Sequence, residues 1–305
     1  MAFVKRRSCK EPYSFFASFD YCVPGPRELT WIVLLFIFGG LLGNAATFIC
    51  GRMFPVEVMT SFATIVSYTL MFVPVMVYAS VVSRRNMGFT DGVAVDSRNF
   101  GHFKPWMVAV LVSLITIAAA YASEIFAWML PPMPDYLKEA MDQLVGGPVL
   151  VTLLSVSVLA PIFEEWLCRG MILRGLLQRM SPSWAILLSA FFFALIHLNL
   201  WQAVPAFILG CLFGYVYYKT GSIKLTMLMH CVNNTLSVLL SRVPAFEDVE
   251  YFKDIMSPWA YWLNYAAFVL VIVSGLIILR SIPKPAGQKS ACRHIPLFND
   301  GDQLQ

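Results

Sequence analysis

The chain has 305 residues, of which 58% are hydrophobic and only 13% are charged, with a formal net charge of +4 and a mean hydropathy of +0.69. A soluble domain has about 25% charged residues, so this composition excludes an ordinary soluble protein and predicts a polytopic membrane protein. The basic residues are divided among short segments, which argues against a nucleic-acid-binding surface.

The apolar runs predict an all-α fold, a bundle of about eight transmembrane helices. The expected spans are residues 29–50, 59–82, 105–130, 147–167, 184–200, 203–218, 225–240 and 259–282. No apolar core of signal-peptide length precedes the first span, so we expect that span to be retained as a helix and not cleaved.

Short sequence patterns refine this expectation. Residues 135–144, after a pair of prolines, have the pattern of an amphipathic helix lying on the membrane surface. The small-residue pairs Gly39-xxx-Gly43 and Gly210-xxx-Gly214 predict faces on which neighbouring helices approach closely.

The distribution of charge orients the chain in the membrane. We expect an N-terminal arm (1–28), a transmembrane domain (29–282) and a polar tail (283–305). With eight spans, every basic cluster falls on one side, whereas the other side has two acidic segments, 135–142 and 247–254. The positive-inside rule then predicts that both termini are cytoplasmic.

The fourth span ends in charges that a membrane helix should not contain. Glu164, Glu165 and Arg169 follow an apolar run that begins at Val149. On insertion scales a charge at the helix centre costs about 2.5–3.5 kcal/mol, so these three residues need a reason to be there. Glu165 and Arg169 are four residues apart and can pair on one helix face. Glu164 lies about 100° around the axis from Glu165 and is left available as a base.

Two later spans supply further polar groups. His197 lies four residues after Phe193, and His230 lies four residues before Asn234. At about 1.5 Å per residue, these groups and Glu164 can lie in the cytoplasmic half of the bundle and converge on one cavity. Each histidine alone could equally be a hydrogen-bonded packing residue. The joint occurrence of the three patterns favours a functional site.

In this order, Glu-Glu-xxx-Arg, Phe-xxx-His and His-xxx-Asn resemble the CAAX-protease and bacteriocin-processing family (CPBP, or Abi), which includes the CAAX prenyl endopeptidases. The resemblance covers residues 148–240, and every motif position is filled. It implies an intramembrane endopeptidase whose helical bundle surrounds a catalytic cavity. The implied setting is an integral membrane protein of a prokaryotic inner membrane.

The resemblance also implies roles for these residues. Glu164 would be the general base, and His197 would help it to hold and polarise the attacking water. His230 and Asn234 would steady the oxyanion, with Glu165, Arg169 and Phe193 in support. The family is often called a metalloprotease, so two readings stay open. In one, water is activated without a metal; in the other, Glu164, His197 and His230 hold a Zn²⁺ ion.

Two other classes of function remain as alternatives. The same scaffold could act without catalysis, for example as an immunity factor that binds a bacteriocin, or the ionisable groups could belong to a proton-coupled transporter. The expected partner of a protease is a membrane-associated or lipidated peptide in the bilayer. The final residues, Asp302 to Gln305, contain no CAAX box, so the chain is not expected to be its own substrate.

Overall fold

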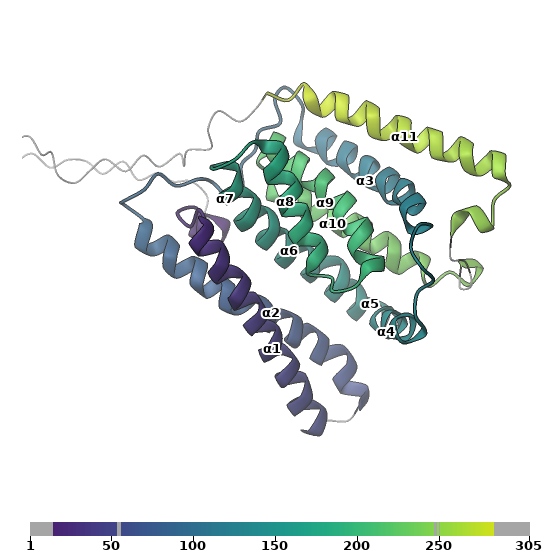
Figure 1. Cartoon of the computed structure of the whole chain (residues 1–305), viewed down its shortest axis with the longest axis horizontal. Coiled ribbons are helices and arrows are strands. Elements are labelled where there is room, and N and C mark those ends of the chain that lie inside the picture. Colours follow the sequence, from purple (N-terminus) through teal and green to yellow (C-terminus); the bar gives the residue numbers. More distant parts are fainter. Residues whose placement is uncertain (1–14, 54–55, 247–248, 250, 284–305) are drawn as a thin grey trace, which may run out of the picture.

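A computed structural model describes residues 15–53, 56–246, 249 and 251–283 of the chain. Within these residues the regular secondary structure is helical, apart from an isolated bridge between Met87 and Thr90. The predicted all-α fold is therefore confirmed, and Figure 1 shows the helices arranged as a bundle with a protruding hairpin.

Seven helical stretches of the described chain are long and apolar enough to cross a membrane. They lie in α1 (Pro26–Met53), α2 (Val56–Asn86), α3 (Pro105–Ala127), a composite helix Val149–Leu177, α9 (Leu200–Thr220), α10 (Ile223–Leu240) and α11 (Pro258–Arg280). The remaining predicted span corresponds to α8 (Pro182–Leu195), an apolar helix of 14 residues. At about 1.5 Å per residue α8 is shorter than the hydrocarbon core of a bilayer.

The composite helix Val149–Leu177, called the site helix below, is built from five consecutive segments. These are α5 (Val149–Thr152), the π-helical η2 (Leu153–Leu159), α6 (Ala160–Glu165), the π-helical η3 (Trp166–Leu173) and α7 (Arg174–Leu177). The predicted span ended near residue 167, and the helix continues for ten residues more. It can do so because Arg169 and Arg174, which lie beyond the predicted end of the span, are fully buried and hydrogen-bonded.

The hairpin of α1 and α2 is held together by a close approach of the two backbones. A Cβ atom on Gly39 would lie 2.2 Å from the carbonyl oxygen of Met71, and one on Gly43 would lie 2.5 Å from that of Ser67. The small-residue face predicted from Gly39 and Gly43 is thus the contact surface between these helices. α1 begins at Pro26, inside the predicted N-terminal arm.

The second small-residue pair also packs as expected. A Cβ atom on Gly210 of α9 would meet Ala190 of α8 at 3.1 Å, and one on Gly214 would meet Ile186 at the same distance. The predicted amphipathic segment forms α4 (Asp135–Gly146). α9 ends at Thr220 and is capped by Gly221, whose φ of 66° is a left-handed conformation that glycine adopts without strain.

The site helix belongs to the first of two large hydrophobic clusters. One joins residues of α2, such as Phe72, to Trp166 and Met171 of the site helix. The other joins α3, α9, α10 and α11 around residues such as Phe213 and Met229. In Figure 1 the α1–α2 hairpin lies on one side of the central helices and α3 and α11 lie on the other.

Candidate active site

The two adjacent glutamates lie in α6, between the two π-helical segments of the site helix. Pro161 has no N–H and cannot make the usual helical hydrogen bond to the carbonyl of Ser157, so the regular α pattern is interrupted just before the glutamates. π-helical turns inside α-helices are frequent at functional sites. The sequence predicted the helix but not these two irregularities.

Glu165 and Arg169 form the ion pair that their spacing predicts. Arg169 Nη1 donates to Glu165 Oε1 at 2.8 Å, and neither side chain has any exposed surface. Arg169 Nη2 also donates to the carbonyl oxygen of Gly210, at 2.9 Å. The guanidinium lies 4.5 Å from the ring centre of Phe193, a contact that stabilises a buried cation. The pair ties the site helix to α8 and α9.

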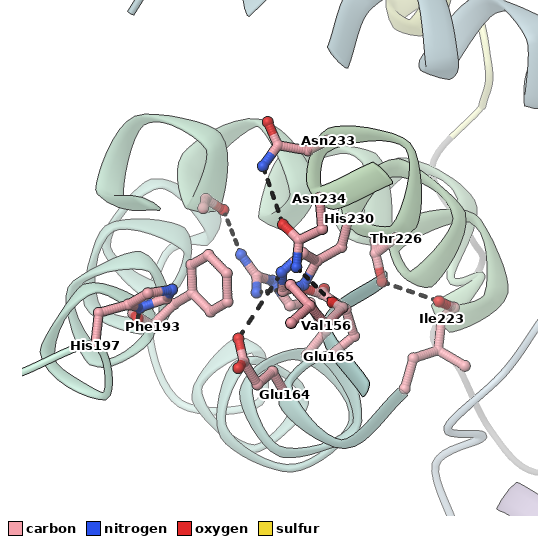
Figure 2. Close-up of polar contacts among 12 residues, drawn as sticks. Val156, Glu164, Glu165, Phe193, His197, Ile223, Thr226, His230, Asn233 and Asn234 are labelled. Carbon is pink, nitrogen blue, oxygen red and sulfur yellow. Dashed lines mark hydrogen bonds and ion pairs between the residues drawn. The ribbon is translucent and has the colours of Figure 1, made fainter. Parts of the chain in front are cut away.

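His230 reaches both glutamates from α10. Its Nδ1 lies 3.2 Å from Glu165 Oε1, and its Nε2 lies 3.9 Å from Glu164 Oε2. A carboxylate oxygen only accepts hydrogen bonds, so Nδ1 is the donor to Glu165. The ring is thereby oriented with Nε2 towards Glu164 (Figure 2).

Glu164 is buried and lies outside the pair of Glu165 with Arg169, as the sequence suggested. Its Oε1 accepts a hydrogen bond from the hydroxyl of Tyr68 on α2. Its Oε2 is buried and has no hydrogen-bond partner among the described residues. Tyr68 escaped the sequence analysis because it lies outside the three motifs, 96 residues away from Glu164.

The sequence predicted that His197 lies on the transmembrane helix 184–200. In the structure it lies in the turn that follows α8. Its Nδ1 lies 2.8 Å from the carbonyl oxygen of Phe193, so this nitrogen bears the proton and Nε2 is the acceptor of the neutral ring. The ring of Phe193 makes edge contacts with both histidines, at 5.2 Å from His197 and 5.3 Å from His230. In the described part of the chain, His197 makes no direct hydrogen bond or ion pair with Glu164.

The turn around His197 is strained and held by side chains. Leu198 has a φ of 56°, a left-handed value that is unfavourable for leucine, and its side chain is 94% exposed. Asn199 donates from Nδ2 to the carbonyl oxygen of His197 at 3.0 Å and accepts from the backbone N–H of Gln202. Backbone strain of this kind persists where the surroundings enforce it and is common at functional sites.

Asn234 connects α10 to the site helix. Its Nδ2 donates to the carbonyl oxygen of Val156 at 2.8 Å, and its Oδ1 accepts from Asn233 at 3.1 Å (Figure 2). Val156 lies in the first π-helical segment. The amide of Asn234 therefore uses one of its two N–H donors inside the protein, and its predicted contribution to an oxyanion site would use the other.

The predicted zinc ligands do not fit a metal as they stand. Within the described residues, no three His, Cys, Asp or Glu side chains are grouped so that they could hold a metal ion. We therefore derive no chemical step through a metal.

A cavity of about 520 Å³ lies at the opposite end of α10 from its N-terminus. Its lining includes Glu124, Asp142, Arg242 and Tyr251 but none of the motif residues. Arg242 donates there to the carbonyl oxygens of Val145 and Gly147. This cavity is not the catalytic cavity that the sequence predicted around Glu164.

Fold and site together define an integral membrane protein with a bundle of helices and a buried cluster of carboxylates and histidines. Glu164 and Glu165 come from the site helix and His230 from α10, while Tyr68 of α2 adds its hydroxyl. Ionisable groups gathered inside a membrane protein are characteristic of a functional site.

Comparisons with known proteins agree with this class. Residues 146–236, which contain all three motifs, match the family model described as "Type II CAAX prenyl endopeptidase Rce1-like". The resemblance inferred from the motifs is therefore confirmed. At the level of the family, this match supports a membrane protease of the CAAX type.

Two curated relatives share about half of the chain. One is the "Putative membrane peptidase YdiL" of Bacillus subtilis (strain 168), 22% identical over 146 residues, which cover 48% of this chain and 59% of the relative. The other is an "Uncharacterized 24.3 kDa protein" of Escherichia coli, 28% identical over 149 residues, which cover 47% of this chain and 65% of the relative. In both cases the match spans less than two thirds of the relative's length. No solved structure matches the chain.

Proposed function

We propose that this protein is an intramembrane endopeptidase that hydrolyses a peptide bond in a membrane-associated or lipidated substrate. The observation that supports this most directly is the environment of Glu164. It is a buried carboxylate with one oxygen held by Tyr68, and the other faces His230 without a hydrogen bond. A carboxylate so placed suits general base catalysis, and it lies within the segment that resembles CAAX endopeptidases.

In the proposed reaction, Glu164 Oε2 removes a proton from water as the water oxygen attacks the peptide carbonyl carbon. The carbonyl oxygen becomes an oxyanion, which the remaining N–H of Asn234 and a protonated Nε2 of His230 stabilise by hydrogen bonding. When the C–N bond breaks, Glu164 returns the proton to the departing amine nitrogen. The products are a carboxylic acid and an amine, which become a carboxylate and an ammonium group when the acid proton passes to the amine, and no other reactant is consumed.

His197 has a separate role in this proposal. Because its Nδ1–H is engaged by the carbonyl of Phe193, its Nε2 can accept a hydrogen bond from the attacking water and help to orient it. Glu164 and His197 need not touch before the substrate binds, since catalytic hydrogen bonds often tighten only in the substrate complex. The proposed mechanism uses the protein's own side chains and no metal.

Cleavage by the purified protein in lipid tests the proposal, with a farnesylated CAAX peptide and a set of unmodified membrane peptides as substrates. We expect the wild type to cleave, Glu164→Gln to lose more than about 99% of turnover, and Glu139→Gln, a change at an exposed carboxylate of α4, to retain it. A strong chelator should leave turnover unchanged. Cleavage by Glu164→Gln at the wild-type rate would overturn the catalytic assignment. Loss of activity with the chelator, restored by Zn²⁺, would overturn the metal-free mechanism.

The comparison of the farnesylated and unmodified peptides tests which kind of substrate the protein cleaves. Cleavage of the farnesylated peptide alone would identify a prenyl-dependent enzyme, whereas cleavage of the unmodified peptides would identify a broader membrane peptidase. Binding of peptides without cleavage by any variant would replace the protease with a non-catalytic scaffold.

A further inference from the structure

Among the described residues, Tyr68 is the one partner of the glutamate cluster that lies outside the matched segment 146–236. It belongs to α2, and its hydroxyl is hydrogen-bonded to Glu164 Oε1. Because an ionised carboxylate has no proton to give, the phenol is the donor. A hydrogen bond to a charged acceptor in a site of low dielectric is one of the stronger polar contacts in a protein.

Aromatic packing fixes the position of this tyrosine. Phe72, one helical turn further along α2, is fully buried and stacks on Phe163 with 5.1 Å between ring centres and 14° between ring planes. Phe163 is the residue before Glu164 in the site helix. The ring of Tyr68 lies 5.3 Å from that of Phe72, so the phenol is held beside α6 by a ring that is itself locked in place.

The contact makes the two oxygens of Glu164 unequal. Oε1 is engaged by Tyr68, whereas Oε2 is buried, has no hydrogen-bond partner among the described residues and lies 3.9 Å from Nε2 of His230. A glutamate side chain anchored at one oxygen loses rotational freedom, because turning the carboxylate would break that hydrogen bond. A base held in one orientation requires less reorganisation during the reaction.

We propose that Tyr68 is a positioning residue that anchors Glu164 Oε1 and so directs Oε2 towards the water. The inference rests on the proposed function, because it names how the base of that reaction is oriented. It also gives the α1–α2 hairpin a role, since the hairpin contributes the anchor to a site that otherwise lies on the site helix, α10 and the turn after α8.

Kinetics of Tyr68→Phe test this role, with Tyr78→Phe as the matched control. Both changes remove a phenol oxygen from α2, and the structure records a bond to Glu164 for Tyr68 but not for Tyr78. We expect Tyr68→Phe to lower kcat about tenfold, the loss that corresponds to one hydrogen bond to a charged group. KM should stay at the wild-type value, the unfolding temperature should fall because the buried Oε1 of Glu164 loses its hydrogen-bond donor, and Tyr78→Phe should behave as the wild type. A purely structural tyrosine would also lower the unfolding temperature but would leave kcat per folded molecule unchanged.

Infrared spectroscopy distinguishes failure of this inference from failure of the proposed function. The difference spectrum of wild type minus Glu164→Gln isolates the carboxylate band of Glu164, whether or not the protein cleaves anything. We expect this band to shift in the Tyr68→Phe background and to stay in place in the Tyr78→Phe background. An unshifted band, or a shifted band with unchanged kcat, would overturn the role of Tyr68. If the band shifts in the Tyr68→Phe background but the wild-type protein cleaves no peptide, the contact between Tyr68 and Glu164 is supported. The proposed protease activity and the positioning role of Tyr68 would then both be wrong.

Discussion

Glu165 and Arg169 are joined by an ion pair of 2.8 Å inside the bundle, and neither side chain has exposed surface. The carboxylate also accepts a hydrogen bond from His230, and the guanidinium donates to Gly210. Burying two charges is costly, so such a pair is stable only when both partners and their further hydrogen bonds are present. We therefore expect the pair to fix the geometry around Glu164 instead of taking part in chemistry.

Removing one member of this pair should destabilise the whole protein. In Arg169→Gln, Glu165 keeps its charge in a buried place without its cation, which should lower the free energy of unfolding by about 3–5 kcal/mol. Denaturant titration in detergent micelles measures this. Arg84→Gln, which changes an exposed arginine at the end of α2, should alter the same quantity by less than about 0.5 kcal/mol. Equal stabilities of the two variants would show that the buried pair does not support the fold.

The α1–α2 hairpin should depend on Gly39 and not on its neighbour Gly40. A methyl group at residue 39 would lie 2.2 Å from the carbonyl oxygen of Met71, whereas at residue 40 the nearest recorded atom is the sulfur of Met71, at 3.9 Å. Gly39→Ala should therefore force the helices apart and cost about 1–3 kcal/mol of unfolding free energy. Gly40→Ala should be neutral or slightly stabilising, because alanine favours helix. A destabilisation at residue 40 as large as at residue 39 would refute this packing argument.

Much of the fold could be predicted because it depends on local patterns. Continuous apolar runs defined the spans, and the small-residue pairs Gly39/Gly43 and Gly210/Gly214 located close helix contacts. The spacing of Glu165 and Arg169 gave their ion pair, since residues four apart meet on a helix face. In each case the relevant partners are close in sequence or are repeated with a fixed period.

The features that could not be predicted depend on contacts between distant segments. Tyr68 is one of twelve tyrosines in the chain, and its sequence context does not mark it as the one that reaches Glu164. Arg174 lies beyond the predicted end of its span at residue 167, yet it is buried and donates to the backbone carbonyls of Phe19 and Cys22. Arg174 is buried because the segment before α1 folds over the end of the site helix. No periodic pattern in the sequence indicates this contact.

The strained turn next to His197 offers a test that is independent of activity. Leu198 adopts a φ of 56° with its side chain 94% exposed, so the conformation does not serve to bury leucine. Leu198→Val should lower the free energy of unfolding by about 1–2 kcal/mol, because a β-branched residue is especially unfavourable in this region. Leu198→Gly should cause little loss, since glycine adopts positive φ readily but has more freedom in the unfolded chain.

A control within α8 separates backbone strain from the general effect of valine. Leu195→Val changes a half-exposed residue in a helical conformation and should cost only about 0.5 kcal/mol. Chemical denaturation of all three variants in the same detergent gives the comparison. A larger loss for Leu198→Gly than for Leu198→Val would mean that the turn is not held in the left-handed conformation.

Replacing His230 should destabilise the protein more than replacing His197, although both histidines should be needed for turnover. His230 donates to the buried carboxylate of Glu165, so His230→Ala leaves that charge with fewer partners and should lower the free energy of unfolding by about 1–3 kcal/mol. In the described part of the chain, the imidazole of His197 is hydrogen-bonded only to the carbonyl of Phe193, four residues earlier, so His197→Ala should remove turnover while the unfolding transition stays close to that of the wild type. His102→Ala, at an exposed histidine in the loop before α3, serves as the control for both measurements.

Peptide cleavage and denaturant titration on the same preparations measure the two effects together. If His197→Ala destabilised the protein as much as His230→Ala, or if either variant cleaved at the wild-type rate, the division between a water-orienting and a cluster-supporting histidine would be wrong.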